Sequence, residues 1–346
     1  LEKEFNIEGG VIPMSFIINN GDQDPAILIN GFGEGYGDTG DHFAVTDEGE
    51  VIYTTVQEGY KEGIKWLHSL VEQDLVDPEA FTQEWSSYVA KGKNHRYGLC
   101  FTWDIANIDN YEDYVMMPAL AGPDGLVNIT RQNGSETSGF DRGRCVLTTS
   151  CRDTALAAAW IDQMYAPLQS PQNNWGTYGE KDADNIFEMS TNAEGGPMLK
   201  HLDLGDASPV EVRQAQSVNG PLAVLNDYYD VYVTQPDDAK WRLDNMHEVY
   251  LDDMHSKYVY PNVFMSIDDT NRVSQLDTDI KKYAEQKKAD WILNGGIDEE
   301  WDEYLQKMED YGLSEYLQIK QKYFDSYQES LAELEAAGSA DDASGN

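Results

Sequence analysis

Flat aromatic side chains that lie beside polar ones are the best candidates for chemistry in this sequence. Trp103 is the last residue of the apolar run Tyr97–Trp103, which has the pattern of a buried strand, and Asp104 follows it. The carboxyl ends of strands in open α/β sheets are where ligands bind. Asn174, Trp175 and Tyr178 stand in the polar, glycine-containing run 172–179, which we expect to be a loop. Trp and Tyr offer a flat apolar face with a polar tip, which suits the C–H faces and hydroxyls of sugar rings.

Most aromatic residues nevertheless have a simpler interpretation. Four tryptophans lie on predicted helix faces and are expected to be core residues: Trp66, Trp160, Trp291 and Trp301. Catalysis has little support, because with 63 acidic residues some carboxylate pair always fits a glycosidase on paper. The sequence contains neither His-Glu-x-x-His nor Gly-x-Ser-x-Gly. We predict no catalytic residue, no metal site and no cofactor.

Charge excludes some partners. The 346 residues include 24 Lys plus Arg against 63 Asp plus Glu, a net charge of −39. Such a chain repels nucleic-acid phosphates, so nucleic-acid binding is rejected. The length is enough for two domains with sizeable cores, and with 40% hydrophobic residues the chain can fold. A solvated acidic surface is the simplest explanation of the charge.

Periodicity and capping signals predict alternating helices and strands. Thr55 to Glu58 has capping-box spacing ahead of an amphipathic helix, and Ser274 has the same spacing ahead of another. Asp153 is placed to cap a third helix. The remaining expected elements are a hairpin over 43–53, strands over 97–103, 114–117 and 144–149, helices from Asp298 and Ser314, and a disordered tail over 338–346.

Several of these segments, in order, resemble the extracellular solute-binding proteins of ABC importers, closest to the long oligosaccharide-binding lipoproteins of Gram-positive bacteria. The resemblance spans roughly residues 11 to 328. The matching segments are Phe43–Tyr53, Glu58–Leu67, Asp77–Gln83, Tyr97–Trp103, Tyr114–Gly125, Arg144–Tyr165 and Asn294–Leu305.

This resemblance implies an α/β fold of two lobes, periplasmic-binding-protein-like and of type II, with the N-terminal half of the first lobe missing. It implies that 1–113 belongs to the C-terminal lobe, 114–170 to the hinge crossing and the N-terminal lobe, and 171–337 mainly to the C-terminal lobe. The calcium loop of many relatives is not carried over, because residues 2–10 do not supply alternating oxygen ligands.

The function implied by the resemblance is oligosaccharide binding and delivery to the transmembrane subunits of an ABC permease. The lobes would close by hinge bending, with Trp103 as a stacking platform and Asp104 as a hydroxyl acceptor. The protein would be an extracellular, non-enzymatic monomer, anchored by an N-terminal lipid outside this chain. The alternative is a secreted glycoside hydrolase or a lectin-like carbohydrate-binding module.

Overall fold

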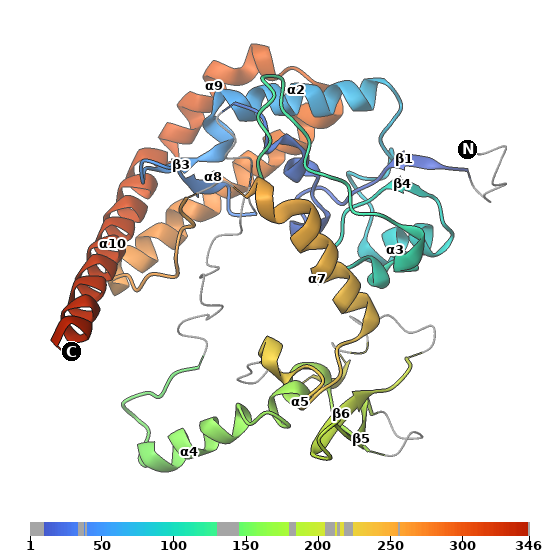
Figure 1. Cartoon of the computed structure of the whole chain (residues 1–346). Coiled ribbons are helices and arrows are strands. Elements are labelled where there is room, and N and C mark those ends of the chain that lie inside the picture. Colours follow the sequence, from blue (N-terminus) through green and yellow to red (C-terminus); the bar gives the residue numbers. More distant parts are fainter. Residues whose placement is uncertain are drawn as a thin grey trace. The chain divides into compact units, whose positions relative to one another are not determined.

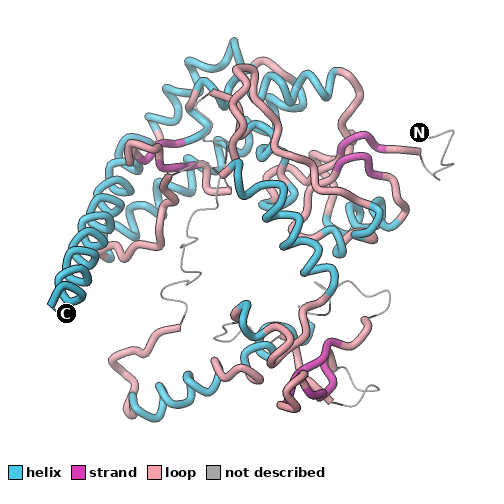
Figure 2. The backbone as a smooth tube through the Cα atoms, in the orientation of Figure 1, coloured by secondary structure: helices cyan, strands magenta, loops and turns pink. Residues whose placement is uncertain are grey.

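A computed structural model describes residues 10–33, 38, 40–129, 145–179, 185–204, 212, 215–217, 224–254 and 257–344. The strands are β1 (Ile12–Met14), β2 (Phe43–Val45), β3 (Val51–Tyr53), β4 (Tyr97–Leu99), β5 (Phe187–Thr191) and β6 (Pro197–His201). The α-helices are α2 (Glu58–Glu72), α3 (Trp85–Lys93), α4 (Thr154–Met164), α5 (Ser170–Trp175), α7 (Asp237–Tyr250), α8 (Ile267–Asn294), α9 (Ile297–Asp310) and α10 (Leu313–Ser344). Figure 2 shows that helix predominates over strand in this mixed α/β chain.

The chain forms two compact units. Unit 1 comprises Leu1–Trp103, Met117–Asp141 and Glu248–Asn346; unit 2 comprises Asp104–Met116 and Arg142–His247. Unit 2 thus joins the short segment that follows Trp103 to a long segment that ends at His247. The expected lobes, with boundaries at 113/114 and 170/171, stay predictions.

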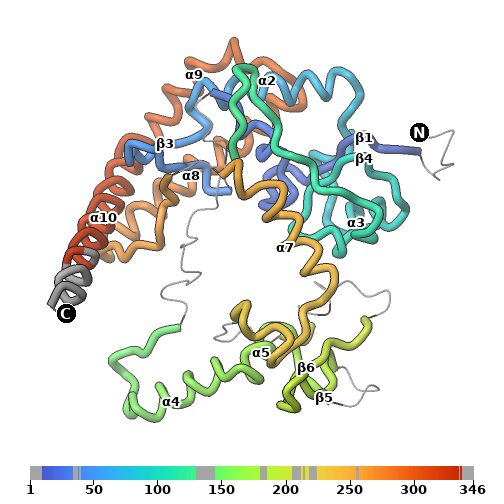
Figure 3. The backbone as a smooth tube through the Cα atoms, viewed as in Figure 1, coloured from blue at the N-terminus to red at the C-terminus, as the bar shows by residue number. Residues whose placement is uncertain are grey.

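Unit 1 is built from helices that come from both ends of the sequence. Helix α2 packs against α8 and α9, so segments drawn in blue and in orange lie together (Figure 3). The predicted apolar face of α2 is buried at Tyr60, Ile64 and Leu67. The core continues through Trp291 and Trp301, which are 1% and 4% exposed, as their helical spacing predicts.

The predicted hairpin of unit 1 is confirmed. Strands β2 and β3 pair antiparallel in the register Phe43 to Tyr53. Gly49 takes a φ of 87° in the connecting turn, a conformation that favours glycine. The ring of Tyr316 on α10 meets the rings of Phe43 and Tyr53 edge to face, which closes the hairpin onto the helices.

Both capping-box predictions are wrong. Helix α2 begins at Glu58 with Gln57 at its N-cap, and Gln57 makes no side-chain cap. The Thr55 hydroxyl instead hydrogen-bonds the Tyr304 hydroxyl at 2.6 Å, and Glu58 accepts from the indole of Trp301. These tertiary contacts outcompete the local cap.

The second cap lies further upstream than expected. Helix α8 starts at Ile267, so Ser274 is inside it. Ser266 is the N-cap, and its hydroxyl accepts from the amide of Asp269 at 3.1 Å. Ser266 and Asp269 have the same spacing as Ser274 and Asp277, so the signal was present eight residues earlier in the sequence. Helix α10 also continues past Gly338 to Ser344, into the tail expected to be disordered.

A buried cation joins α8 to the start of the chain. The ammonium of Lys288 is 3.0 Å from Asp24 Oδ2 and 3.6 Å from Asp38 Oδ2, and all three side chains are at most 10% exposed. Burial alone would lower the pKa of Lys288, but the two carboxylates raise it. For the acid Asp38 burial alone has the opposite effect and would raise the pKa, but His42 and Lys288 lower it to about 2. The cluster is therefore ionised and paired inside unit 1.

Unit 2 has a smaller apolar core around one hairpin. Strands β5 and β6 pair antiparallel, and their buried residues Phe187 and Leu199 pack with Ile186 and Val233. Helix α4 begins as predicted, because the Asp153 carboxylate accepts from the amide of Leu156 at 2.9 Å.

Three strand predictions and one core prediction differ from the structure. Residues 114–117 and 145–149 are coil, and Arg144 lies outside the described residues. The strand expected over 97–103 is shortened to β4, which pairs in parallel with β1. Trp160, expected in the core, is 60% exposed. Residues 114–117 and 145–149 carry apolar residues but have no strand neighbours within the described part of the chain.

The buried ion cluster generates a stability prediction. We expect Lys288→Met to lower the free energy of unfolding by about 3–5 kcal/mol, because it leaves two buried carboxylates without their cation. Lys322→Met is the matched control, since Lys322 is 62% exposed and its ion pair with Asp269 should contribute nothing measurable. Urea unfolding followed by circular dichroism measures both. Equal midpoints for the two variants would show that Lys288 does not stabilise unit 1.

The core of unit 2 generates a pH prediction. Burial lowers the pKa of His201 to about 4, against which a hydrogen bond with Thr234 acts only in part. The unfolded chain therefore binds the proton more readily, so this group costs stability as pH falls from about 6.5 towards 4. Trp175 lies 5.4 Å from His201, ring centre to ring centre, and its fluorescence reports unfolding of this unit. We expect the melting temperature of the His201→Gln variant to fall less steeply between about pH 6.5 and 4 than that of the unaltered chain. The same fall in both proteins would contradict the assignment.

Candidate functional site

Trp103 is presented to solvent by a backbone that is fixed two residues earlier. The Tyr88 hydroxyl accepts from the amide of Phe101 at 2.9 Å and lies 3.0 Å from its carbonyl oxygen. Tyr88 is itself fully buried, and Phe101 is 9% exposed. Trp103, in contrast, is 58% exposed. An indole on a rigid support with a large open surface is suited to stacking on a flat apolar ligand face.

The carboxylate of Asp104 pairs with an arginine and caps a short helix. One carboxylate oxygen accepts from the amide of Ala106 at 3.1 Å, at the start of a 3₁₀ turn (Ile105–Asn107). The other accepts from Nε of Arg242 on α7 at 2.8 Å. Burial raises the pKa of Asp104, while these two hydrogen bonds act in the opposite direction.

The run around Asn174 and Trp175 is a helix, so the expectation of a loop there is wrong. Both residues belong to α5, and Asn174 is 8% exposed. The Trp175 ring packs against Phe187 at 6.3 Å and against His201 at 5.4 Å between ring centres. This places Trp175 at the edge of the core of unit 2, where its contacts stabilise the fold.

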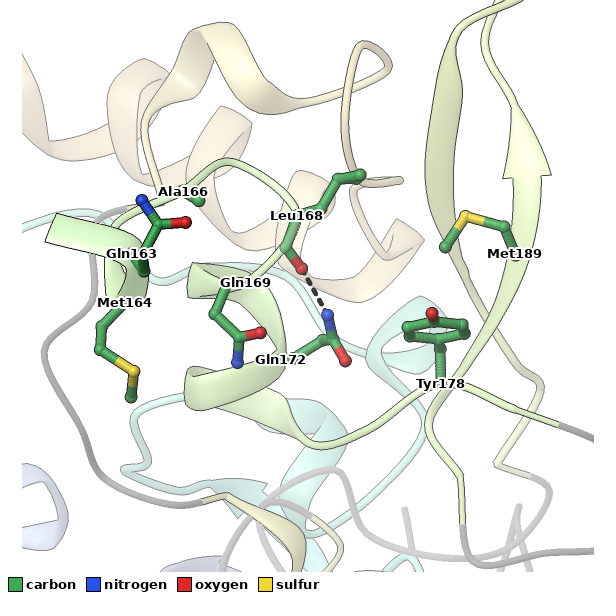
Figure 4. Close-up of a pocket in the computed structure, with 8 residues that line it drawn as sticks. All are labelled: Gln163, Met164, Ala166, Leu168, Gln169, Gln172, Tyr178 and Met189. Carbon is green, nitrogen blue, oxygen red and sulfur yellow. Dashed lines mark hydrogen bonds between the residues drawn. The ribbon is translucent and has the colours of Figure 1, made fainter. Parts of the chain in front are cut away.

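Tyr178 is the candidate ligand-binding residue of the run 172–179 that lines a pocket. It is 46% exposed and borders a depression of about 300 Å³ (Figure 4). The pocket residues come from the end of α4, from α5 and its approach, and from β5: Gln163, Met164, Ala166, Leu168, Gln169, Gln172, Tyr178 and Met189. The Gln172 amide donates to the Leu168 carbonyl at 2.6 Å, which holds its side chain on the pocket rim (Figure 4).

The three glutamines were missed by sequence reasoning. Their amide groups can both donate and accept, which matches a ligand rich in hydroxyls. Gln169 and Gln172 are three residues apart and so share one side of the helical turn at the start of α5. That spacing is a usable signal, but the expected loop began at Gln172, so the two residues were not considered as one helical face.

The five predicted residues are divided between the units. Trp103 ends the first segment of unit 1, while Asp104, Asn174, Trp175 and Tyr178 belong to unit 2. Their roles in ligand binding stay predictions. Within the described ranges, no group of three His, Cys, Asp or Glu side chains is close enough to hold a metal ion. None of the helices that the structure describes combines the length and apolarity that a membrane span requires.

Comparison with known proteins gives a sequence relative. No family model matches the chain. The fructooligosaccharide ABC transporter substrate-binding protein FusA of Streptococcus pneumoniae serotype 4 is 46% identical over 324 residues, which cover 93% of this chain and 59% of FusA. The chain thus spans little more than half the length of this curated relative.

Solved structures agree with this relationship. The S. pneumoniae FusA structure in complex with kestose matches with a TM-score of 0.83 and 46% identity, over 94% of this chain and 65% of that one. An HMO-binding, ABC-transporter-associated solute-binding protein from Bifidobacterium longum infantis has a TM-score of 0.70 at 20% identity, over 94% of this chain and 67% of its own, and supports the fold alone. The chain therefore belongs to the substrate-binding proteins of ABC transporters, of which it spans a part.

Proposed function

We propose that this chain is the oligosaccharide-binding part of an ABC importer's extracellular substrate-binding protein. The observation that carries the proposal is its 46% identity, over 324 residues, to a protein named for fructooligosaccharides. Fructooligosaccharides are accordingly the first ligand class to test. The whole protein would be a monomer tethered to the cell membrane by an N-terminal lipid and would deliver its ligand to the permease's transmembrane subunits.

The aromatic and polar groups support a carbohydrate ligand. Trp103 offers an open indole, and Tyr178 lies beside three amide side chains in the pocket of unit 2. Sugars need both features, because each ring has apolar C–H faces and a rim of hydroxyls. Sealing a large aromatic face removes about 150–250 Å² from water, which at about 25 cal/mol per Å² gives roughly 4–6 kcal/mol as an upper value. Micromolar affinity requires about 8 kcal/mol, so two such contacts with hydrogen bonds suffice.

Closure of the two lobes completes the proposed cycle. A ligand drives a hinge only when it binds the closed state more tightly than the open one. Contacts that the ligand makes in the closed state alone would supply that difference in affinity.

Removing the indole tests the stacking role. In titration calorimetry of the 346-residue chain with kestose, we expect Trp103→Ala to weaken binding at least about tenfold, because the ligand loses its largest apolar contact. The melting temperature should hold, since the side chain is 58% exposed.

Phe264→Ala is the matched control, because Phe264 is an aromatic residue of unit 1 that is 74% exposed. Unchanged affinity in Trp103→Ala would remove the stacking role. Failure of the unaltered chain to bind any oligosaccharide would remove the proposed function of the chain itself. Chromatography of the sugars after incubation tests the alternative enzyme, and cleavage products would favour it.

A further inference from the structure

Five asparagines of the sequence are each followed by glycine, the dipeptide in which an asparagine side chain most readily reacts with the backbone. The five are Asn20, Asn30, Asn133, Asn219 and Asn294. Glycine favours this reaction because it has no Cβ to obstruct the approach of its amide nitrogen to the side chain. Asn133 and Asn219 lie outside the described residues. The surroundings of the other three decide which of them is free to react.

Two of these dipeptides are held in place. Asn30 is 3% exposed, and a Cβ at Gly31 would lie 2.6 Å from a backbone nitrogen of a neighbouring segment. At the end of α8 the amide of Gly295 donates to the carbonyl of Trp291 at 2.9 Å. The side-chain amide of Asn294 donates to a carboxylate one turn earlier at 2.7 Å. Both reacting groups of Asn294 and Gly295 are thus engaged in hydrogen bonds.

The third dipeptide is open at both reacting groups. Asn20 is exposed, and its side chain makes no capping hydrogen bond to the 3₁₀ turn (Gly21–Gln23) that follows it. Within the described residues the amide of Gly21 donates no hydrogen bond, as expected for the first residue of such a turn. Nothing lies within 4 Å of the position that a Cβ of Gly21 would occupy. The rotation that ring closure requires breaks a hydrogen bond inside the turn, from the amide of Gln23 to the carbonyl of Asn20 at 2.8 Å, whereas at Asn294 it would disrupt the end of a 28-residue helix.

We propose that Asn20 and Gly21 form a self-modification site at which Asn20 converts to aspartate and isoaspartate. The deprotonated amide nitrogen of Gly21 attacks Cγ of Asn20 and closes a succinimide ring, and the bond from Cγ to Nδ2 breaks as ammonia leaves. Water then opens the ring at either carbonyl carbon, so one water is consumed for each ammonia released. Opening at the former backbone carbonyl gives isoaspartate, which adds a methylene to the backbone. The reaction does not depend on which sugar is bound.

The modification site lies between two attachments of the chain to α8. Asp24 Oδ2 accepts from the ammonium of Lys288 at 3.0 Å and from the amide of Asn19 at 2.6 Å. The side-chain amide of Asn19 also donates to the carbonyl of Glu285 on α8 at 3.0 Å. An extra methylene at position 20 changes the separation of Asn19 and Asp24. Isoaspartate there therefore weakens the pairing of Asp24 with Lys288, on which the buried ion cluster depends.

Peptide mapping of the aged protein tests the site. The 346-residue chain is incubated at mildly alkaline pH, and tandem mass spectrometry locates each converted asparagine. We expect Asn20 to convert at least about tenfold faster than Asn30 and Asn294, because those two react only after local unfolding. In urea, where the fold is lost, the three rates should be similar. Equal rates in the folded chain, or an Asn20 that stays intact while the unfolded chain converts, would overturn the proposal.

Urea unfolding of fresh and aged proteins tests the effect on the ion cluster. We expect the midpoint of the unaltered chain to fall in step with its isoaspartate content at position 20. Asn20→Gln should keep its midpoint on ageing, because the longer side chain closes a ring far more slowly. Asn20→Asp supplies the charge without the extra methylene, so its fresh midpoint should equal that of the fresh unaltered chain. Asn294→Gln is the matched control and should age like the unaltered chain. A constant midpoint in the aged unaltered chain, or the same loss in aged Asn20→Gln, would count against the coupling to the cluster.

Discussion

The pairing of a buried cation with two carboxylates is the constraint on which unit 1 depends. Taking Lys288 out of water is costly, and only close carboxylates offset that cost. Asp24 provides one, and it also caps the 3₁₀ turn Pro25–Ile29 by accepting from the amide of Ala26. Helix α8 cannot shift along its axis without breaking this arrangement. The pair therefore fixes where the early part of the chain lies against a helix that is more than 260 residues later.

A second polar network fixes the backbone that leads to Trp103. Ser15 donates to Asp77 at 2.8 Å, and Lys91 pairs with the same carboxylate at 2.7 Å. The Tyr88 hydroxyl reaches the carbonyl of Ser15 at 3.3 Å and the backbone of Phe101. Strand β1, helix α3 and the end of β4 are thus held as one piece. The exposure of Trp103 is in consequence a property of a rigid support and not of a loose loop.

Local signals predicted the elements whose partners are inside the described chain. The hairpin over 43–53, the Asp153 cap and the burial of Trp291 and Trp301 all follow from spacing, since each needs a nearby hydrogen bond or a nearby apolar face. The cap at Thr55 failed because Tyr304, which lies 249 residues away, takes its hydroxyl. A capping rule that considers only neighbouring residues cannot predict a partner so far away in the sequence. At the candidate site, the role of Trp103 stays a prediction, whereas the polar run 172–179 contains the end of helix α5 together with Gln172.

Trp160 and Trp301 show why pattern alone does not decide burial. Both lie on helices with apolar residues at spacings of three and four, so the sequence predicted the same fate for both. Trp301 is 4% exposed because α2 lies against α9, while Trp160 is 60% exposed on a helix with no buried residue. Periodicity states which face a helix needs to bury, and the neighbouring elements determine whether it does so. Within the described residues, the neighbours of α9 bury its apolar face, and no neighbour of α4 does the same.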